Sequence, residues 1–351
     1  SDEFADQPAV RAYLNCAIAQ VYNSHGRITR SIELFEQNLP VLIDARGLGD
    51  FDVISVKNNL ALAYEEAGEM ERADALFQDA IGFASTLDHP ASDELSRTLQ
   101  INYAGKVLVA LGRYDQALAT YDELIQGFDK NSVESGLEYH TVRINRAQAL
   151  ERLGRLSDAE VALRAAIDDA ESELGSRAPL VLAAMNNVAS LCVMTGRIDE
   201  AVEIYASLAG TMEDVHGVGS TRASQAWLNH GQLLESSGRH QEALSVYEHA
   251  MARSRDRVPA TAPVWIHLLA RRGVVLSTLE RTDDAIVSLT EAIQAIDRSD
   301  DGAIRPVWRE MVLTFLVDAL ESTGATEQAA TYRELLNDHV AAFGSSSPTA
   351  R

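Results

Sequence analysis

The segment Gly196–Tyr205, GRIDEAVEIY, contains a pattern that recurs along this chain of 351 residues. An Ala stands five residues after the Gly, and an aromatic or aliphatic residue usually stands nine after it. The pattern returns in GEMERADALF at Gly68, GRYDQALATY at Gly112, GRLSDAEVAL at Gly154, GRHQEALSVY at Gly238 and ERTDDAIVSL at Glu280. These anchors are spaced by 44, 42, 42, 42 and 42 residues, and weaker copies at Gly26 and Gly324 bring the total to eight repeats.

Each repeat predicts two antiparallel helices. The Gly supplies the left-handed residue that ends the first helix, and acids three or four residues later suit the positive N-terminal end of the second. Glu280 stands where the other repeats have Gly, which predicts a turn strained by about 1 kcal/mol. Ser31 replaces the Ala of the first repeat and Arg333 the aromatic of the last, and we interpret both as features of solvent-facing terminal repeats.

Composition limits the possible partners and chemistry. The formal charge of −22 argues against nucleic acid or an anionic membrane surface and favours a basic partner. Cys16 and Cys192 are far apart in the sequence and match no metal-ligand spacing, so we interpret them as small core residues. No catalytic, cofactor or metal motif interrupts the repeats, and no apolar run approaches the roughly 20 residues of a membrane-spanning helix. We therefore predict a protein without cofactors that is not an enzyme.

The two ends of the chain differ from the repeats. The sequence begins SDEF rather than with Met, so an upstream targeting segment is not ruled out. We predict a cytoplasmic location and leave a periplasmic one open. Residues 344–351, GSSSPTAR, have the composition of a disordered tail.

The repeat resembles a known family. A small residue lies seven before the anchor in Ala19, Ala61, Gly105, Ala147, Ala189, Gly231 and Gly273. Together with the Ala and the aromatic columns, this resembles the tetratricopeptide repeat, whose usual period is about 34 residues. The 42-residue period and the phrase ELGSRAPLVLAAMNNVASL from Glu173 resemble the long-helix subclass of kinesin light chains. FADQPAVRAYLNCAIAQVY, from Phe4, resembles segments that join kinase domains to repeat arrays in some bacterial serine/threonine kinases.

The resemblance implies an all-α, right-handed α-solenoid of about eight antiparallel helix pairs. We expect one solenoid over residues 1–343, with repeats at about 9–46, 51–87, 93–129, 135–173, 179–215, 221–257, 263–298 and 304–343. It also implies a concave groove, lined by the first helix of each pair, that binds extended peptides or partner helices.

Polar side chains recur on the half of the first helices that carries no core stripe. At about 100° per residue, positions nine and ten before the anchor lie on this half, and so do positions three and six before it. The predicted groove residues at these positions are Asn58, Asn59, Glu65, Asn102, Lys106, Asn145, Gln148, Glu151, Asn186, Asn187, Asn229, Gln232, Glu235 and Arg271.

Two interpretations of this pattern remain open. The asparagines either hold the backbone of an extended peptide, which amides can do without reading its sequence, or bond the neighbouring repeat. The glutamates either form a solvated face or favour basic side chains on the ligand.

Arg271 replaces the Asn of its column, so the groove changes character towards its carboxyl-terminal end. The cluster Arg253, Arg255 and Arg257 either complements a helix end or forms a phosphate or acidic-peptide site.

Three functions follow as hypotheses. The first is a non-enzymatic protein–protein interaction module, part of a larger signalling or regulatory protein, that binds a peptide or partner protein in the groove. The alternative is a ligand-gated solenoid that senses a peptide or metabolite and controls an attached effector domain. Self-association through the solenoid ends is a further possibility.

Overall fold

The structure is a computed structural model that describes residues 7–128, 136–299 and 305–343. These residues form sixteen α-helices and one short π-helix, and they contain no strand, which confirms the predicted all-α fold of helix pairs. The chain divides into two compact units, Ser1–Gly175 and Ser176–Arg351. Whether the pairs form one continuous solenoid therefore stays a prediction, and the expected tail at 344–351 lies outside the described residues.

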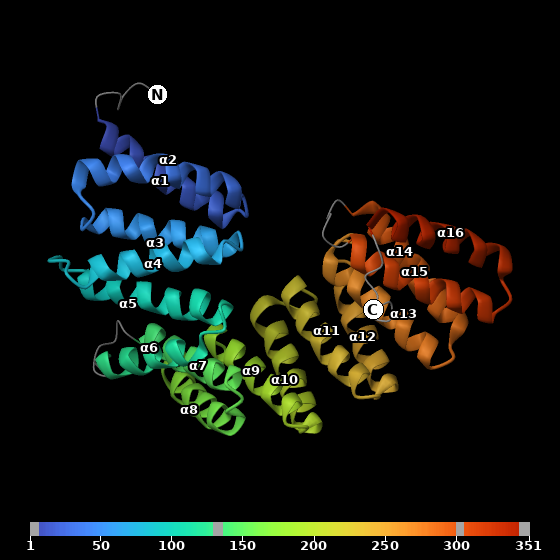
Figure 1. Cartoon of the computed structure of the whole chain (residues 1–351). Coiled ribbons are helices and arrows are strands. Elements are labelled where there is room, and N and C mark those ends of the chain that lie inside the picture. The colour runs from blue at the N-terminus through green and yellow to red at the C-terminus, as the bar shows by residue number, and fades with distance from the viewer. Residues whose placement is uncertain (1–6, 129–135, 300–304, 344–351) are drawn as a thin grey trace. The chain divides into compact units, whose positions relative to one another are not determined.

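The first unit contains four consecutive helix pairs, stacked from blue to green in Figure 1. Their bounds are α1 Pro8–Ser24, α2 Ile28–Arg46, α3 Phe51–Glu66, α4 Met70–Ala84, α5 Ser92–Asn102, η2 Tyr103–Leu108, α6 Tyr114–Gly127, α7 Gly136–Arg152 and α8 Leu156–Leu174.

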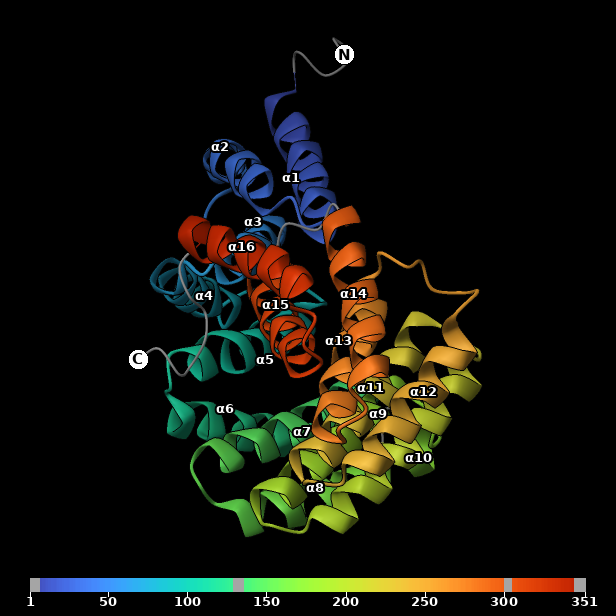
Figure 2. The same ribbon diagram turned by 90° about the vertical axis from the view of Figure 1, so that its right-hand side faces the viewer.

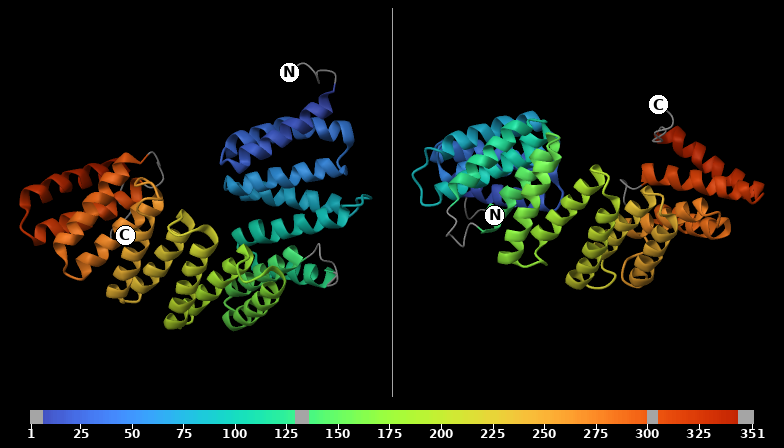
Figure 3. Two further views of the ribbon diagram at one scale, coloured as in Figure 1. Left: turned by 180° about the vertical axis from the view of Figure 1, so that it is seen from behind. Right: turned by 90° about the horizontal axis from the view of Figure 1, so that it is seen from below.

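The second unit contains four more pairs, and consecutive helices lie against each other in Figures 2 and 3. Their bounds are α9 Pro179–Met194, α10 Ile198–His216, α11 Thr221–Ser236, α12 His240–Ser254, α13 Pro263–Thr278, α14 Thr282–Arg298, α15 Arg305–Ser322 and α16 Thr326–Phe343.

The anchor residue of each repeat ends the first helix as predicted. Gly68 has φ 80°, and the N–H of Glu69 donates to the carbonyl of Tyr64 at 2.8 Å, the pattern of a left-handed helix end. Glu280 adopts the same conformation with φ 59° and is the one non-glycine residue with positive φ among the described residues. The left-handed conformation of Glu280 is therefore the one from which strain was predicted at this turn.

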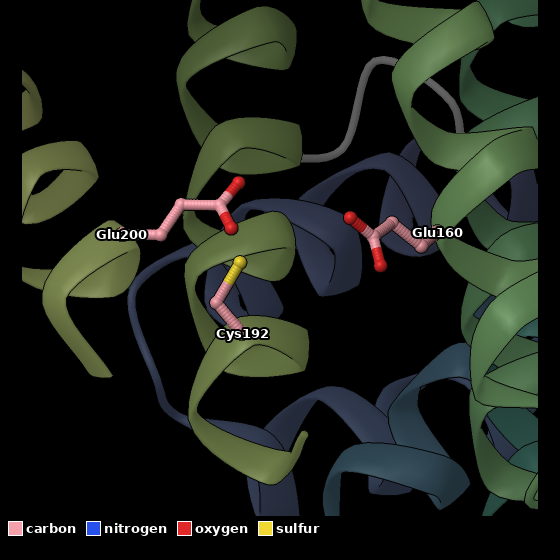
Figure 4. Close-up of side chains that lie close together, drawn as sticks. All are labelled: Glu160, Cys192 and Glu200. Atoms are coloured by element: carbon pink, nitrogen blue, oxygen red, sulfur yellow. The ribbon is translucent and has the colours of Figure 1, made fainter. Parts of the chain in front are cut away.

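The core lies between the two helices of each pair and between neighbouring pairs. The Ala column is fully buried, as are Phe77, Tyr121 and Tyr247 of the aromatic column. Cys16 and Cys192 are buried as predicted, and Figure 4 shows Cys192 of α9 beside Glu200 of α10.

Glycine in the small column allows the closest packing. A Cβ at Gly231 would lie only 2.2 Å from Cε1 of Tyr247, so this tyrosine ring occupies the space that a methyl group would need. Tyr205, whose repeat has Ala189 in the small column, is only half-buried. Phe77 is fully buried although its repeat has Ala61, so the close approach of the Tyr247 ring is a feature of the Gly231 repeat and not of the column as a whole.

The interpretation of Ser31 as a solvent-facing residue is wrong. Its side chain is fully buried, and its hydroxyl donates to the carbonyl of Ala19 at 2.8 Å. A buried Ser can replace Ala here because its one polar group finds an acceptor on the partner helix. Arg333 is exposed and pairs with Glu321.

The first helix of the third pair is not a regular α-helix, which the repeat pattern did not predict. It changes from α5 to the π-helix η2 at Tyr103. A π-turn accommodates extra residues within a helix. The 44-residue spacing from Gly68 to Gly112 is two residues longer than the four that follow it, but the same spacing recurs from Glu280 to Gly324, where the described residues contain no π-helix, so it was a weak signal.

In the described part of the chain, no helix is both long and apolar enough to cross a membrane.

Candidate functional site

In the first unit, two of the predicted asparagines form a hydrogen bond between neighbouring repeats. Asn102 of α5 donates from Nδ2 to Oδ1 of Asn58 on α3 at 3.1 Å, across one repeat interface. Asn58 is only 8% exposed and also approaches Asn59, at 3.4 Å. The placement of Asn58 on the open half of its helix is therefore wrong, because its amide is enclosed between the repeats. For this pair the structural interpretation holds.

Other predicted residues of the first unit also have partners within the chain. Lys106 of η2 lies 3.6 Å from the carboxylate of Glu65 on α3. Asn145 of α7 lies beside the buried hydroxyl of Tyr121, whose pKa is raised by burial and lowered in part by this amide. Gln148 is exposed and Glu151 half-buried. The first unit thus brings four of its predicted residues together in two pairs, Asn58 with Asn102 and Glu65 with Lys106.

In the second unit, four of the predicted residues line one pocket. Its volume is about 610 Å³. Asn229, Gln232 and Glu235 come from successive turns of α11, and Arg271 comes from α13. The remaining lining residues are Ser190, Val193, Tyr205, Leu233, Ser236 and His240.

An ion pair forms one wall of the pocket. Glu235, whose side chain is 14% exposed, accepts from Nη1 of Arg271 at 3.2 Å and from the hydroxyl of Tyr247 at 2.8 Å. The guanidinium of Arg271 also lies 5.5 Å from the ring centroid of Trp308. Burial, together with the Glu235 charge, raises the pKa of Tyr247. The ion pair is therefore a polar surface that is held in place by the fully buried Tyr247.

Several polar groups of the pocket are unused within the described part of the chain. Nε of Arg271 and Nδ1 of His240 are buried and have no hydrogen-bond partner there. Asn229 accepts from Gln225 at 3.0 Å through Oδ1, which leaves its N–H₂ group available. Buried polar groups without partners are uncommon in folded proteins. Two of the eleven such side-chain atoms in the described residues belong to this pocket, and with the amide of Asn229 they make it a place where a polar ligand can bind.

The remaining predicted groove residues lie outside this pocket. Asn186 and Asn187 are on α9, exposed and half-buried respectively, and neither lines it. Sequence reasoning missed Ser190, Tyr205 and His240 as lining residues. Ser190 stands in the same column as Gln232, six before its anchor, so that column was the available signal.

Most glutamates at the position three residues before the anchor form ion pairs within the chain. Glu65 faces Lys106, Glu235 binds Arg271 and Glu321 binds Arg333. Because three of the four carboxylates at this position already have a cation of the chain, and only Glu151 has no ion pair within the described ranges, this column gives little reason to expect a basic ligand.

Two arginines of the cluster are bound within the chain. Arg253 donates to Glu213 at 2.8 Å, and Arg257 donates to the carbonyl of Val218 at 2.7 Å. Both hold the junction before α11, whereas Arg255 is exposed and has no ion pair within the described ranges, so the phosphate-site interpretation stays a prediction.

Comparisons with known proteins agree with this architecture. Tetratricopeptide repeat models match residues 53–84, 103–130, 138–214 and 180–256, which together cover about half of the chain. The chain is 25% identical over 277 residues to Protein KINESIN LIGHT CHAIN-RELATED 1 of Arabidopsis thaliana. The match covers 76% of this chain but only 43% of that protein, so the chain spans less than half the length of this curated relative.

Solved structures show the same fold. The nearly identical TPR-like repeats of a Podosopora anserina protein described as a kinesin light chain match with a TM-score of 0.51 at 19% identity. They cover 60% of this chain and 97% of that one. The apo form of RapI matches with a TM-score of 0.62 at 12% identity, over 84% of this chain and 78% of its own. The chain is thus a member of the tetratricopeptide repeat family, of the kinesin-light-chain-like type.

Proposed function

We propose that the chain is a non-enzymatic interaction module that holds an extended peptide of a partner protein in the pocket on α9, α11 and α13. Tetratricopeptide repeats generally mediate protein–protein interactions. The observation that carries the proposal is that four of the predicted groove residues line this one pocket, among them Asn229 with its available N–H₂ group.

The chemistry of the pocket suits a peptide backbone. Amides such as Asn229 and Gln232 can donate and accept at once, which matches the alternating N–H and C=O groups of an extended chain. The four predicted lining residues occupy repeat positions on the first helices, so they are held by the solenoid and need little ordering on binding. Leu233 and Val193 add apolar area for a side chain of the peptide.

A selection from a display library of random peptides tests the proposal without a known partner. We expect peptides selected on the full chain to bind it and to lose at least about tenfold in affinity with the variant Asn229→Ala/Gln232→Ala, since each amide–backbone bond contributes about 1 kcal/mol. Circular dichroism should show an unchanged fold. Peptides that bind both proteins equally would contradict the assignment of the pocket.

The alternative, a ligand-gated solenoid that controls an effector domain, stays a prediction. The described residues form helix pairs only, so an effector would have to lie elsewhere in a longer protein. The proposals that the chain is part of a signalling protein and associates through its ends rest on the sequence alone.

A further inference from the structure

A second pocket, of about 320 Å³, lies on α13, α14 and α15 of the same unit. None of the predicted groove residues belongs to it. Its lining residues are Ser277, Thr278, Thr282, Phe315, Asp318, Ala319 and Ser322.

This pocket occupies the repeat positions of the first one, two repeats further along the chain. Phe315 and Asp318 stand nine and six residues before Gly324, where Asn229 and Gln232 stand before Gly238. The two pockets are therefore related by the repeat, and both include residues of α13. The shared helix is the reason to consider one ligand for both.

The two pockets differ in chemistry. Arg271 brings a cation to the first pocket, whereas no Lys, Arg or His lines the second. Asp318 is exposed, and no ion pair of its carboxylate is found within the described ranges. Arg281, next to Thr282 in the chain, is bound to Asp284 at 2.7 Å. The negative charge of the second pocket is thus free to act on a ligand.

The hydroxyl groups reinforce this polarity. Ser277 donates to the carbonyl of Gly273, Thr278 to that of Val274 and Ser322 to that of Ala319, at 3.1, 3.1 and 2.8 Å. Each hydroxyl proton is used by its own helix, so these groups offer a ligand only their oxygen lone pairs. Of the four lining hydroxyls only that of Thr282 keeps a proton to donate, so the pocket mainly offers acceptors and suits a donor.

Helix ends favour the same sign of charge. Thr278 and Ser322 are the last residues of α13 and α15, where the helix dipole is negative and attracts cations. The N-terminus of α14 opposes this effect, but Asp283 and Asp284 lie in its first turn. The Phe315 ring adds an apolar surface over which a cation can lie.

We propose that the second pocket binds the guanidinium or ammonium group of an Arg or Lys side chain carried by the peptide that occupies the first pocket. The source of the cation rests on the proposed function, whereas the chemistry of the pocket does not. The bound peptide would then have a direction, with its basic residue towards α15.

Titration of the full chain, ¹⁵N-labelled for NMR, with the Nα-acetylated forms of arginine amide, lysine amide and norleucine amide tests the inference, because acetylation leaves the side chain as the only charge. We expect the two cations to shift the amide resonances of α13–α15 and norleucine amide to have no effect there. Asp318→Asn should weaken cation binding about fivefold, as expected for an exposed charge pair. Asp338→Asn, which removes an exposed charge from α16 outside the pocket, should leave binding unchanged.

Three results would overturn the inference: equal binding of norleucine amide, equal losses in both variants, or saturation of the pocket by Mg²⁺ or Ca²⁺ with no binding of the amides. These outcomes are independent of the first pocket, because the probes are too short to reach it. A failure of the proposed function would instead appear as peptide binding that ignores Asn229 and Gln232.

Discussion

Replacing Gly231 with Ala tests the close packing of the Tyr247 ring against this glycine. The added Cβ would lie 2.2, 2.7 and 2.9 Å from Cε1, Cδ1 and Cζ of Tyr247. Carbon atoms in contact normally lie about 3.5–4.0 Å apart, so the ring would have to move by more than about 1 Å. It is fully buried, and its hydroxyl is bound to Glu235, which leaves no direction of easy relaxation.

The expected cost follows from two opposing effects. Overpacking of a core typically costs about 1–3 kcal/mol, and a displaced Tyr247 would also lose its bond to a carboxylate, about 1.5–3 kcal/mol. The better helix propensity of Ala returns about 1 kcal/mol. We therefore expect Gly231→Ala to lower the free energy of unfolding by about 2 kcal/mol.

Urea denaturation followed by tryptophan fluorescence measures this effect selectively. The three tryptophans of the chain, Trp227, Trp265 and Trp308, all lie in the second unit. At an m-value of about 2 kcal/mol/M, the midpoint should fall by roughly 1 M.

Gly210→Ala in α10 is the matched control for this experiment. A Cβ at Gly210 meets nothing within 4 Å, so this variant should be unchanged or more stable. If Gly231→Ala behaved like Gly210→Ala, the close approach of Tyr247 would be refuted.

Three further predictions address single positions. Glu280→Gly should raise the free energy of unfolding by about 1 kcal/mol in urea denaturation, because Glu280 has φ 59°, and no gain would refute the strain at this turn. In a double-mutant cycle, Asn58→Ala and Asn102→Ala should be non-additive by about 1 kcal/mol, since they share one hydrogen bond, and additive effects would contradict that bond. Burial lowers the pKa of His230, so the unfolded chain takes up a proton near pH 6.5 that the folded chain does not, and stability should fall as the pH drops through that value. The free energy of unfolding, measured from pH 7.5 to 5, should depend less on pH in His230→Leu. An unchanged pH dependence would contradict the contribution of His230.

The repeat pattern predicted the fold because it encodes physical requirements that recur in every copy. Left-handed anchors such as Gly68 and buried small residues such as Ala73 must return at one spacing if the pairs are to stack. Even the exception at Glu280 has the backbone conformation expected of its column. The π-helix at Tyr103 was missed because a two-residue insertion does not by itself reveal where the chain absorbs it.

The candidate site was only partly predictable. Counting angles around a helix places a side chain on a face, but it does not reveal partners on the next repeat. Asn58 and Gln232 belong to the same class of predicted residues, yet one is bonded between repeats and the other lines a pocket. The difference depends on the neighbouring residues, Asn102 in one case and Arg271 with Glu235 in the other.

The affinity of a selected peptide for two matched variants tests the central claim most directly. Gln232 and Gln148 occupy the same repeat position, but only Gln232 lines the pocket of the second unit. We predict that Gln232→Ala weakens peptide binding about fivefold and that Gln148→Ala leaves it unchanged. Equal effects of the two substitutions, or none from Gln232→Ala, would contradict the assignment of this pocket as the peptide-binding site.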